Sequence, residues 1–151
     1  MKKFLLAIVA VLCVSAVSAQ EYKNSIGLRV GYGAELQYER HFSAENYLEV
    51  NLGLSDFDFN DAFVNVMYNW NCCEWDWTPN AGKWFLSAGV GASLGLWEKA
   101  FQVGVAGNCA FGIRFNKPVT LSIDYRPTVF FLGNAWGKGF ANFGLTCTYN
   151  F

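Results

Sequence analysis

The chain has 151 residues, of which 53% are hydrophobic and 18% aromatic, and its formal net charge is −1 at pH 7. This length predicts one domain rather than several. No cluster of Lys and Arg in the sequence could neutralise a phosphate backbone, so a nucleic-acid partner is not expected.

The N-terminal residues 1–19 predict a secretory signal peptide. Their sequence, MKKFLLAIVAVLCVSAVSA, begins with a basic segment, continues with an apolar run and ends with small residues at a typical cleavage position. Cleavage after Ala19 would leave 151 − 19 = 132 residues, which form the expected domain, 20–151. This part contains no uninterrupted apolar stretch of about twenty residues, so no membrane-spanning helix is expected in it.

Eight segments of alternating apolar and polar residues come after the signal peptide, and each is bounded by residues that favour turns. We predict that they are β-strands, at 23–31, 34–42, 47–57, 62–70, 84–97, 101–115, 119–132 and 140–151. The first turn, placed at Tyr32-Gly33, interrupts an alternation that otherwise runs from Ile26 to Phe42. The longest expected connection is NCCEWDWTPNAGK, residues 71–83.

The two faces of these segments differ in a way that predicts a membrane barrel. Alternation alone suits both a soluble barrel with an apolar cavity and a membrane barrel with a polar lumen. One face here is rich in Val, Leu, Ile and Tyr, whereas the other carries Asn, Gln, charges of both signs and a row of glycines: Gly53, Gly89, Gly91, Gly95, Gly104, Gly112 and Gly144. Small residues and mutually neutralising charges fit a narrow lumen. The sequence therefore predicts an all-β fold, an eight-stranded antiparallel up-and-down transmembrane β-barrel.

Aromatic residues gather at the ends of the predicted strands, as in the interfacial girdles of transmembrane barrels. One predicted rim contains Phe42, Tyr47, Trp70, Trp75, Trp77, Trp84, Phe115, Tyr149 and Phe151. The other contains Tyr32, Phe57, Phe59, Trp97, Phe101, Phe131, Trp136 and Phe140.

The C-terminal sequence TCTYNF, with Tyr149 and Phe151 on the apolar face, resembles the signature by which outer-membrane barrels are recognised by their assembly machinery. The segments IGLRVGYGAELQYERHF, YLEVNLGL, WFLSAGVGASLG and VTLSIDYRPTVFF resemble successive strands of small outer-membrane β-barrel proteins of the Bacteroidota. Residues 124–127, Asp-Tyr-Arg-Pro, resemble an element common in the later strands of those proteins. The resemblance covers nearly all of the mature chain and implies an eight-stranded barrel of the OmpX or OmpW kind, whose members are mostly without an assigned activity.

An even number of strands places both termini on one side of the membrane, which we expect to be the periplasmic side of a bacterial outer membrane. The Tyr32-Gly33 turn and the loops around Asp58, Glu98 and Gly137 would then face outward, and the turns around Glu45, Cys72-Cys73 and Lys117 would face the periplasm. The expected partners are outer-membrane lipid, lipopolysaccharide and the assembly machinery, and the expected oligomeric state is a monomer.

Seven charged residues are predicted to point into the lumen: Arg29, Glu35, Glu39, Glu49, Arg114, Asp124 and Arg126. They could line a selective polar path, or they could form a packed structural network. Because eight strands enclose an interior just wide enough for side chains, the structural network is favoured.

The single histidine, His41, lies two positions from Glu39 on the same strand face. This pair invites comparison with the acyl-transfer sites of outer-membrane lipid A deacylases. The sequence has no His-x-Ser element like theirs, so a hydrogen-bonded interior histidine is the preferred interpretation and no catalytic residue is predicted.

Four cysteines lie beyond the signal peptide. Cys109 and Cys147 should lie two strands apart, at about 9.5 Å, which exceeds the roughly 7 Å that a disulfide tolerates. Cys72 and Cys73 lack the Cys-x-x-Cys spacing of a metal site, and the glycines of Gly89 to Gly95 alternate on a strand rather than cradle a phosphate. No metal and no cofactor are therefore expected.

These observations predict an integral outer-membrane β-barrel with a structural or interaction role in the cell envelope. Three alternatives stay open: a lipid-modifying barrel enzyme, a narrow channel for very small or apolar solutes, and a secreted soluble barrel that binds an apolar ligand. An exposed nucleophile near His41 would indicate the enzyme, and a continuous gap past Arg114 and Arg126 would indicate the channel.

Overall fold

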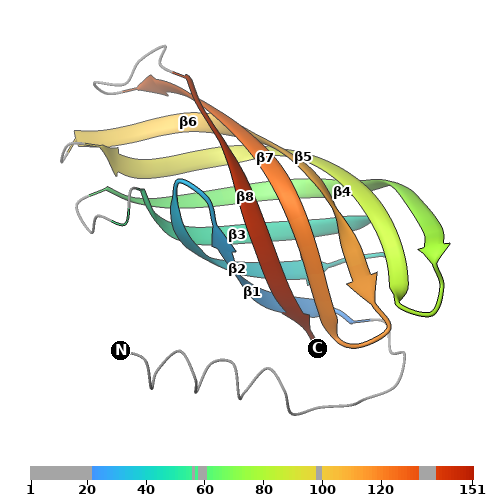
Figure 1. Cartoon of the computed structure of the whole chain (residues 1–151). Helices are drawn as coiled ribbons and strands as arrows, with labels where there is room; N and C mark the ends of the chain where they lie inside the picture. Colours follow the sequence, from blue (N-terminus) through green and yellow to red (C-terminus); the bar gives the residue numbers. More distant parts are fainter. Residues whose placement is uncertain (1–21, 56, 58–60, 98–99, 133–138) are drawn as a thin grey trace, which may run out of the picture.

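The computed structural model describes residues 22–55, 57, 61–97, 100–132 and 139–151, and within them the chain forms one closed antiparallel barrel (Figure 1). Each strand pairs with its neighbours in sequence, and β1 closes the barrel against β8. The strands are β1 (Asn24–Val30), β2 (Gly33–His41), β3 (Asn46–Ser55), β4 (Ala62–Thr78), β5 (Gly82–Trp97), β6 (Ala100–Phe115), β7 (Val119–Leu132) and β8 (Gly139–Asn150). The predicted fold class is confirmed. The expected signal peptide, 1–19, and the expected loop positions Asp58, Glu98 and Gly137 lie outside the described residues.

The predicted strand ends agree with the observed ends within two residues, except at the end of β4. The segment predicted as the longest connection is instead the second half of this strand, which continues to Thr78 and turns through 79–81 into β5. The predicted turn at Cys72-Cys73 is therefore wrong. The register shifts by one residue between Asn71 and Cys73, which is a β-bulge. The bulge changes the phase of the alternation, so Trp75 pairs with Trp84 and Glu74 reaches Arg114.

The register around the barrel defines its diameter. If the paired residues are followed around the barrel from Ile26 on β1, through β2 to β7, the path reaches Gly139 on β8. Ile26 itself, however, pairs with Tyr149 of β8 where the barrel closes. One circuit of the barrel therefore displaces the register by 149 − 139 = 10 residues. With about 3.3 Å per residue and about 4.7 Å between strands, eight strands with this displacement tilt by roughly 40° and enclose a radius of about 8 Å. Side chains alone can fill an interior of this width.

The barrel is apolar on its outer surface and polar inside. Leu28, Leu52 and Val90 are 46%, 57% and 54% exposed on the outside. Arg29 and Glu49, by contrast, are each 1% exposed in the lumen. One predicted rim residue is misplaced: Tyr47 points inward, is buried, and shares a hydrogen bond of 3.1 Å between its hydroxyl and Ser87 Oγ.

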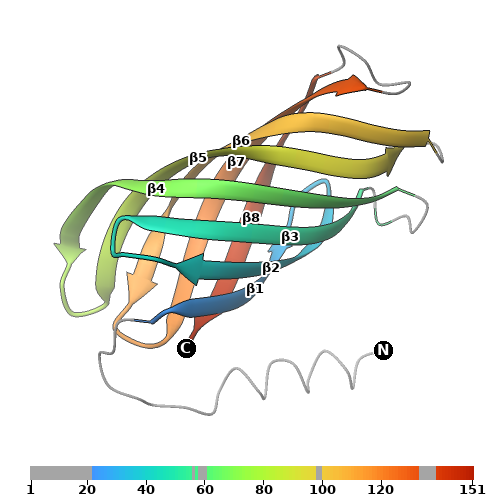
Figure 2. The same ribbon diagram turned by 180° about the vertical axis from the view of Figure 1, so that it is seen from behind.

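The two ends of the barrel differ. The start of β1 and the C-terminus lie at one end, here called the terminal end, together with the β2–β3, β4–β5 and β6–β7 turns (Figure 2). At the opposite, loop end, the β1–β2 hairpin turns through Gly31, Tyr32 and Gly33. None of the described residues forms a helix long and apolar enough to cross a membrane.

Candidate functional site

Two arginines and three carboxylates, Arg29, Arg126, Glu35, Glu49 and Asp124, meet in the middle of the lumen and form the central charge network. Glu35 bridges the two arginines, since its Oε1 accepts from Arg29 Nη1 and its Oε2 from Arg126 Nη1, both at 2.5 Å. Arg126 Nη2 donates to Glu49 Oε1 at 2.7 Å, and Arg29 Nη2 lies 2.6 Å from Asp124 Oδ1. The network therefore joins four strands across the lumen, β1, β2, β3 and β7.

Neutral side chains donate further hydrogen bonds to the carboxylate oxygens of this network. Asn51 Nδ2 donates to Glu49 Oε1 at 2.7 Å and Asn69 Nδ2 donates to Glu49 Oε2 at 2.9 Å. Thr146 Oγ1 donates to Asp124 Oδ2 at 2.8 Å. Both oxygens of each of the three carboxylates thus accept a hydrogen bond, as buried charges require.

The strand register places the first pair of the network directly. Arg29 and Glu35 lie opposite each other across the β1–β2 hairpin, six residues apart in the chain. The guanidinium of Arg29 then needs space on the β8 side, and Gly144 provides it, because a Cβ there would overlap the guanidinium. Arg29 also donates to Asn142 Oδ1 on β8. The glycine at 144 is therefore a spatial requirement of the network.

Apolar side chains also occupy the lumen next to the network. Met67 is fully buried inside the barrel, and Phe63 and Phe130 line its loop end. The cavity on the loop side of Arg126 measures only about 30 Å³, room for no more than a few water molecules. The alternation of residue types predicts a polar lumen and gives no sign of these apolar residues.

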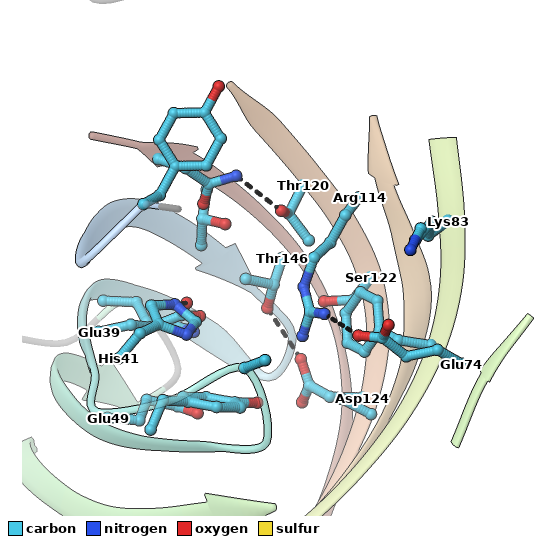
Figure 3. Close-up of a pocket in the computed structure, with 18 of the residues that line it drawn as sticks. Glu39, His41, Glu49, Glu74, Lys83, Arg114, Thr120, Ser122, Asp124 and Thr146 are labelled. Atoms are coloured by element: carbon cyan, nitrogen blue, oxygen red, sulfur yellow. Dashed lines mark hydrogen bonds and ion pairs between the residues drawn. The ribbon is translucent and has the colours of Figure 1, made fainter. Parts of the chain in front are cut away.

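The terminal half of the lumen is hollow. A cavity of about 680 Å³ opens at the terminal end and ends at Glu49, Asp124 and Arg126; we call it the terminal cavity (Figure 3). Glu39, His41 and Glu49 lie on one side of it, and Arg114, Lys83 and Ser122 lie on the other. Most of the residues that line it are polar or charged, and members of the central charge network lie at its inner end.

Two of the seven predicted lumen charges lie in the terminal cavity and not in the network. Glu39 accepts from Gln37 Nε2 at 2.7 Å and contacts His41 Nε2 at 3.1 Å. Arg114 donates to Glu74 Oε1 at 2.5 Å and to Asn71 Oδ1 at 2.8 Å, and its guanidinium lies 4.4 Å from the ring centre of Phe85. Glu74 enters the cavity only because of the bulge in β4.

His41 is close to both a hydroxyl and a carboxylate, but the three groups do not have the arrangement of a serine triad. Its Nε2 lies 3.2 Å from Ser25 Oγ and 3.1 Å from Glu39 Oε2, so one nitrogen serves both partners. A serine triad needs the acid on Nδ1 and the serine on Nε2. In addition, Ser25 is fully buried and donates to Asn150 Oδ1 at 2.8 Å. The imidazole also stacks on Tyr47, with ring centres 5.0 Å apart, as a packed interior side chain does.

Cys72, Cys73, Cys109 and Cys147 are the described cysteines, and they form no disulfide with one another. Cys109 pairs with Tyr125 across the β6–β7 ladder, whereas Cys147 pairs with Leu121 across the β7–β8 ladder. Among the described residues, no group of three or more His, Cys, Asp or Glu side chains is arranged to hold a metal ion.

Tyr149 and Phe151, the predicted assembly signal, lie at the terminal end of β8. Their rings stack with centres 6.4 Å apart, and Phe151 is 54% exposed. Asn24 and Phe151 exchange backbone hydrogen bonds of 3.0 and 2.8 Å, so the last residue of the chain belongs to the β1–β8 closure.

Several polar residues of the site were not among the predicted site residues: Ser25, Asn51, Asn69, Asn142 and Thr146. Each occupies a strand position on the same face as the charged residues, and this is the signal that could have identified them. Which carboxylate each would contact depends on the register between strands.

The comparisons with known proteins bear on the fold alone. No family model matches the chain, and no curated protein matches its sequence. The structure is similar to that of a transmembrane β-barrel designed de novo, with a TM-score of 0.57 and 13% identity over 89% of this chain and 100% of that one. It is also similar to the N-terminal β-barrel domain of OprF from Pseudomonas aeruginosa, with a TM-score of 0.58 and 12% identity over 85% and 95% of the two chains. The chain therefore has the fold of an eight-stranded outer-membrane-type β-barrel.

Proposed function

We propose that the protein is an integral outer-membrane β-barrel with a closed lumen, and that it has a structural or interaction role in the cell envelope and no catalytic centre. The observation that carries this proposal is the distribution of polarity. Apolar side chains such as Leu52 and Val90 cover the outside, while compensated charges are buried inside. In water this arrangement would expose apolar surface all round the barrel, whereas in lipid the apolar face meets hydrocarbon and the closed ring of strands pairs the backbone groups.

The finer assignment rests on the sequence. The proposed location is a bacterial outer membrane, with the terminal end toward the periplasm and residues 1–19 removed as a signal peptide. The resemblance to OmpX- and OmpW-like barrels of the Bacteroidota supports this assignment, as does the exposed aromatic pair Tyr149 and Phe151 at the C-terminus. Outer-membrane lipid, lipopolysaccharide and the assembly machinery are the proposed partners of a monomeric barrel.

Fractionation of cells that express the full chain tests the location. We expect the protein in the outer-membrane fraction, with an electrophoretic mobility that changes when the sample is boiled, because a closed barrel resists detergent until it is heated. The matched control is the Phe151→Ala variant, which keeps all eight strands and which we expect to reach the outer membrane in smaller amounts. A soluble protein with the same mobility before and after boiling would mean that the apolar face meets a ligand or a partner instead of lipid.

The central charge network also makes a prediction about transport. Since the ion pairs of Arg126 with Glu35 and Glu49 lie between the terminal cavity and the small cavity at the loop end, we expect planar bilayers that contain the purified protein to conduct no more current than bare bilayers. Stable unitary currents in the wild-type protein would favour the channel alternative and would show that the network opens.

A further inference from the structure

The strand β4 extends beyond its neighbour β3 at the terminal end of the barrel. The last pair between them is Asn46 with Trp70. Asn71 makes the final contacts, since its backbone N–H donates to Glu45 O and its Nδ2 donates to Ala44 O, both at 2.7 Å. Residues 72–78 then pair with β5 on one side, and within the described part of the chain no strand pairs with their other side. Figure 2 shows β4 curving past the β2–β3 turn.

This free edge begins where the aromatic rim of the barrel lies, at Trp70, Trp75 and Trp84. Inside the hydrocarbon layer a row of unpaired backbone groups would be costly, because no water is present to satisfy it. At and beyond the rim, water reaches the edge, and residues 72–74 and 76–78 are all exposed. If the barrel has the proposed orientation, the edge faces the periplasm.

The edge is held in an extended, preformed conformation by aromatic packing. Trp75 stacks on Trp77 at 5.3 Å between ring centres, and Trp77 contacts Trp84 at 6.0 Å. Phe111 of β6 lies 5.4 Å from Trp84 and 6.2 Å from Trp77. Because these contacts fix the β4–β5 hairpin to β6, an added strand would not have to order it first.

The charges that flank the edge are acidic. Glu45 lies on the β2–β3 turn beside it, while Glu74 and Asp76 lie on β4 itself. Lys83 and Arg114 lie on β5 and β6, on the other side of β4 from the free edge. Glu74 is ion-paired with Arg114, so the carboxylates that a strand added at the edge would meet are those of Glu45 and Asp76.

We propose that residues 72–78 bind an extended, basic segment of a periplasmic protein as an additional antiparallel or parallel strand. Backbone hydrogen bonds supply affinity in this mode, and alternate side chains supply specificity. A second copy of the same chain is a poor occupant, since antiparallel self-pairing centred on Trp75 sets Glu74 opposite Asp76. The proposal names the interaction partner within the envelope role proposed above and rests on that role for its compartment.

The test uses the purified, folded barrel in detergent micelles and a probe peptide of eight alternating lysine and threonine residues with blocked ends. Backbone NMR should show saturable shifts and slowed amide exchange confined to residues 72–78 and their neighbours. A peptide with glutamate in place of lysine should bind at least about threefold more weakly, and one with alternate backbone nitrogens methylated at least about tenfold more weakly.

Asp76→Lys is the matched protein variant, because Asp76 is exposed and lies on the edge. This substitution should lower the affinity for the lysine peptide by about threefold or more. Asp61→Lys, the same charge change at the loop end, should leave that affinity unchanged. Equal binding of the lysine and glutamate peptides, or concentration-dependent protection of 72–78 without peptide, would overturn the proposal, the latter in favour of self-association. Since this assay reads the folded barrel directly, its outcome is independent of the fractionation result.

Discussion

Replacing Arg126 with methionine should lower the free energy of unfolding by about 3–5 kcal/mol. The substitution removes the donors to Glu35 Oε2 and to Glu49 Oε1 and leaves both carboxylates in the lumen. Each of these side chains is at most 3% exposed, so both carboxylates lose a charged partner while they stay buried. Urea unfolding of the barrel in lipid vesicles, followed by tryptophan fluorescence, measures the loss.

Arg114→Met is the matched control, because it makes the same chemical change at the rim of the terminal cavity. Arg114 and its partner Glu74 are 28% and 39% exposed, so this pair should contribute no more than about 1 kcal/mol. Adding Glu35→Gln and Glu49→Gln to Arg126→Met should recover part of the lost stability, since the uncompensated charges are then gone. Equal losses for the two arginine variants would contradict the assignment of the central charge network as the polar core of the barrel.

Replacing Leu52 with arginine should destabilise the barrel in lipid vesicles by about 2–4 kcal/mol. Leu52 is 57% exposed on the outer surface and pairs with Leu36 and Val64, between the two aromatic rims. In a membrane this position faces hydrocarbon, where a guanidinium loses its hydration. In a soluble barrel the same position faces water, and the substitution should change stability by no more than about 0.5 kcal/mol.

Phe42→Arg serves as the control for Leu52→Arg, because Phe42 is 62% exposed at the terminal rim. A charge close to the interface should cost only about 0–1 kcal/mol. A loss of stability that is large for Leu52→Arg and small for Phe42→Arg would depend on depth in the bilayer and would indicate contact with lipid. Two equally small effects would place the apolar face in contact with something other than a bilayer.

The strands could be predicted from the sequence because alternation is a local property. A strand with one face in lipid and the other in a narrow lumen must change polarity at every residue, and this pattern located seven of the eight strands at both ends. The pattern failed at Asn71, where the bulge inserts one residue and shifts the phase. Residues 72–78 therefore do not continue the alternation of residues 62–70, although they belong to the same strand.

The contacts of the site could not be predicted in the same way. The sequence placed Arg29, Glu35, Glu49, Asp124 and Arg126 on one face, but a face contains many possible pairs. Tyr47 was assigned to the aromatic rim because it begins a strand, although its ring belongs to the lumen and stacks on His41.

The sequence by itself determined the number of strands, their polarity and the location of the charges on the inner face, because these depend on which residues are neighbours along the chain. Only the tertiary structure decided that Glu35 bridges two arginines from β1 and β7, that Met67 is buried inside the barrel, and that β4 extends past β3 with a free edge. The reason is physical. These features depend on the ten-residue displacement and the bulge, which are properties of how strands meet around a closed barrel.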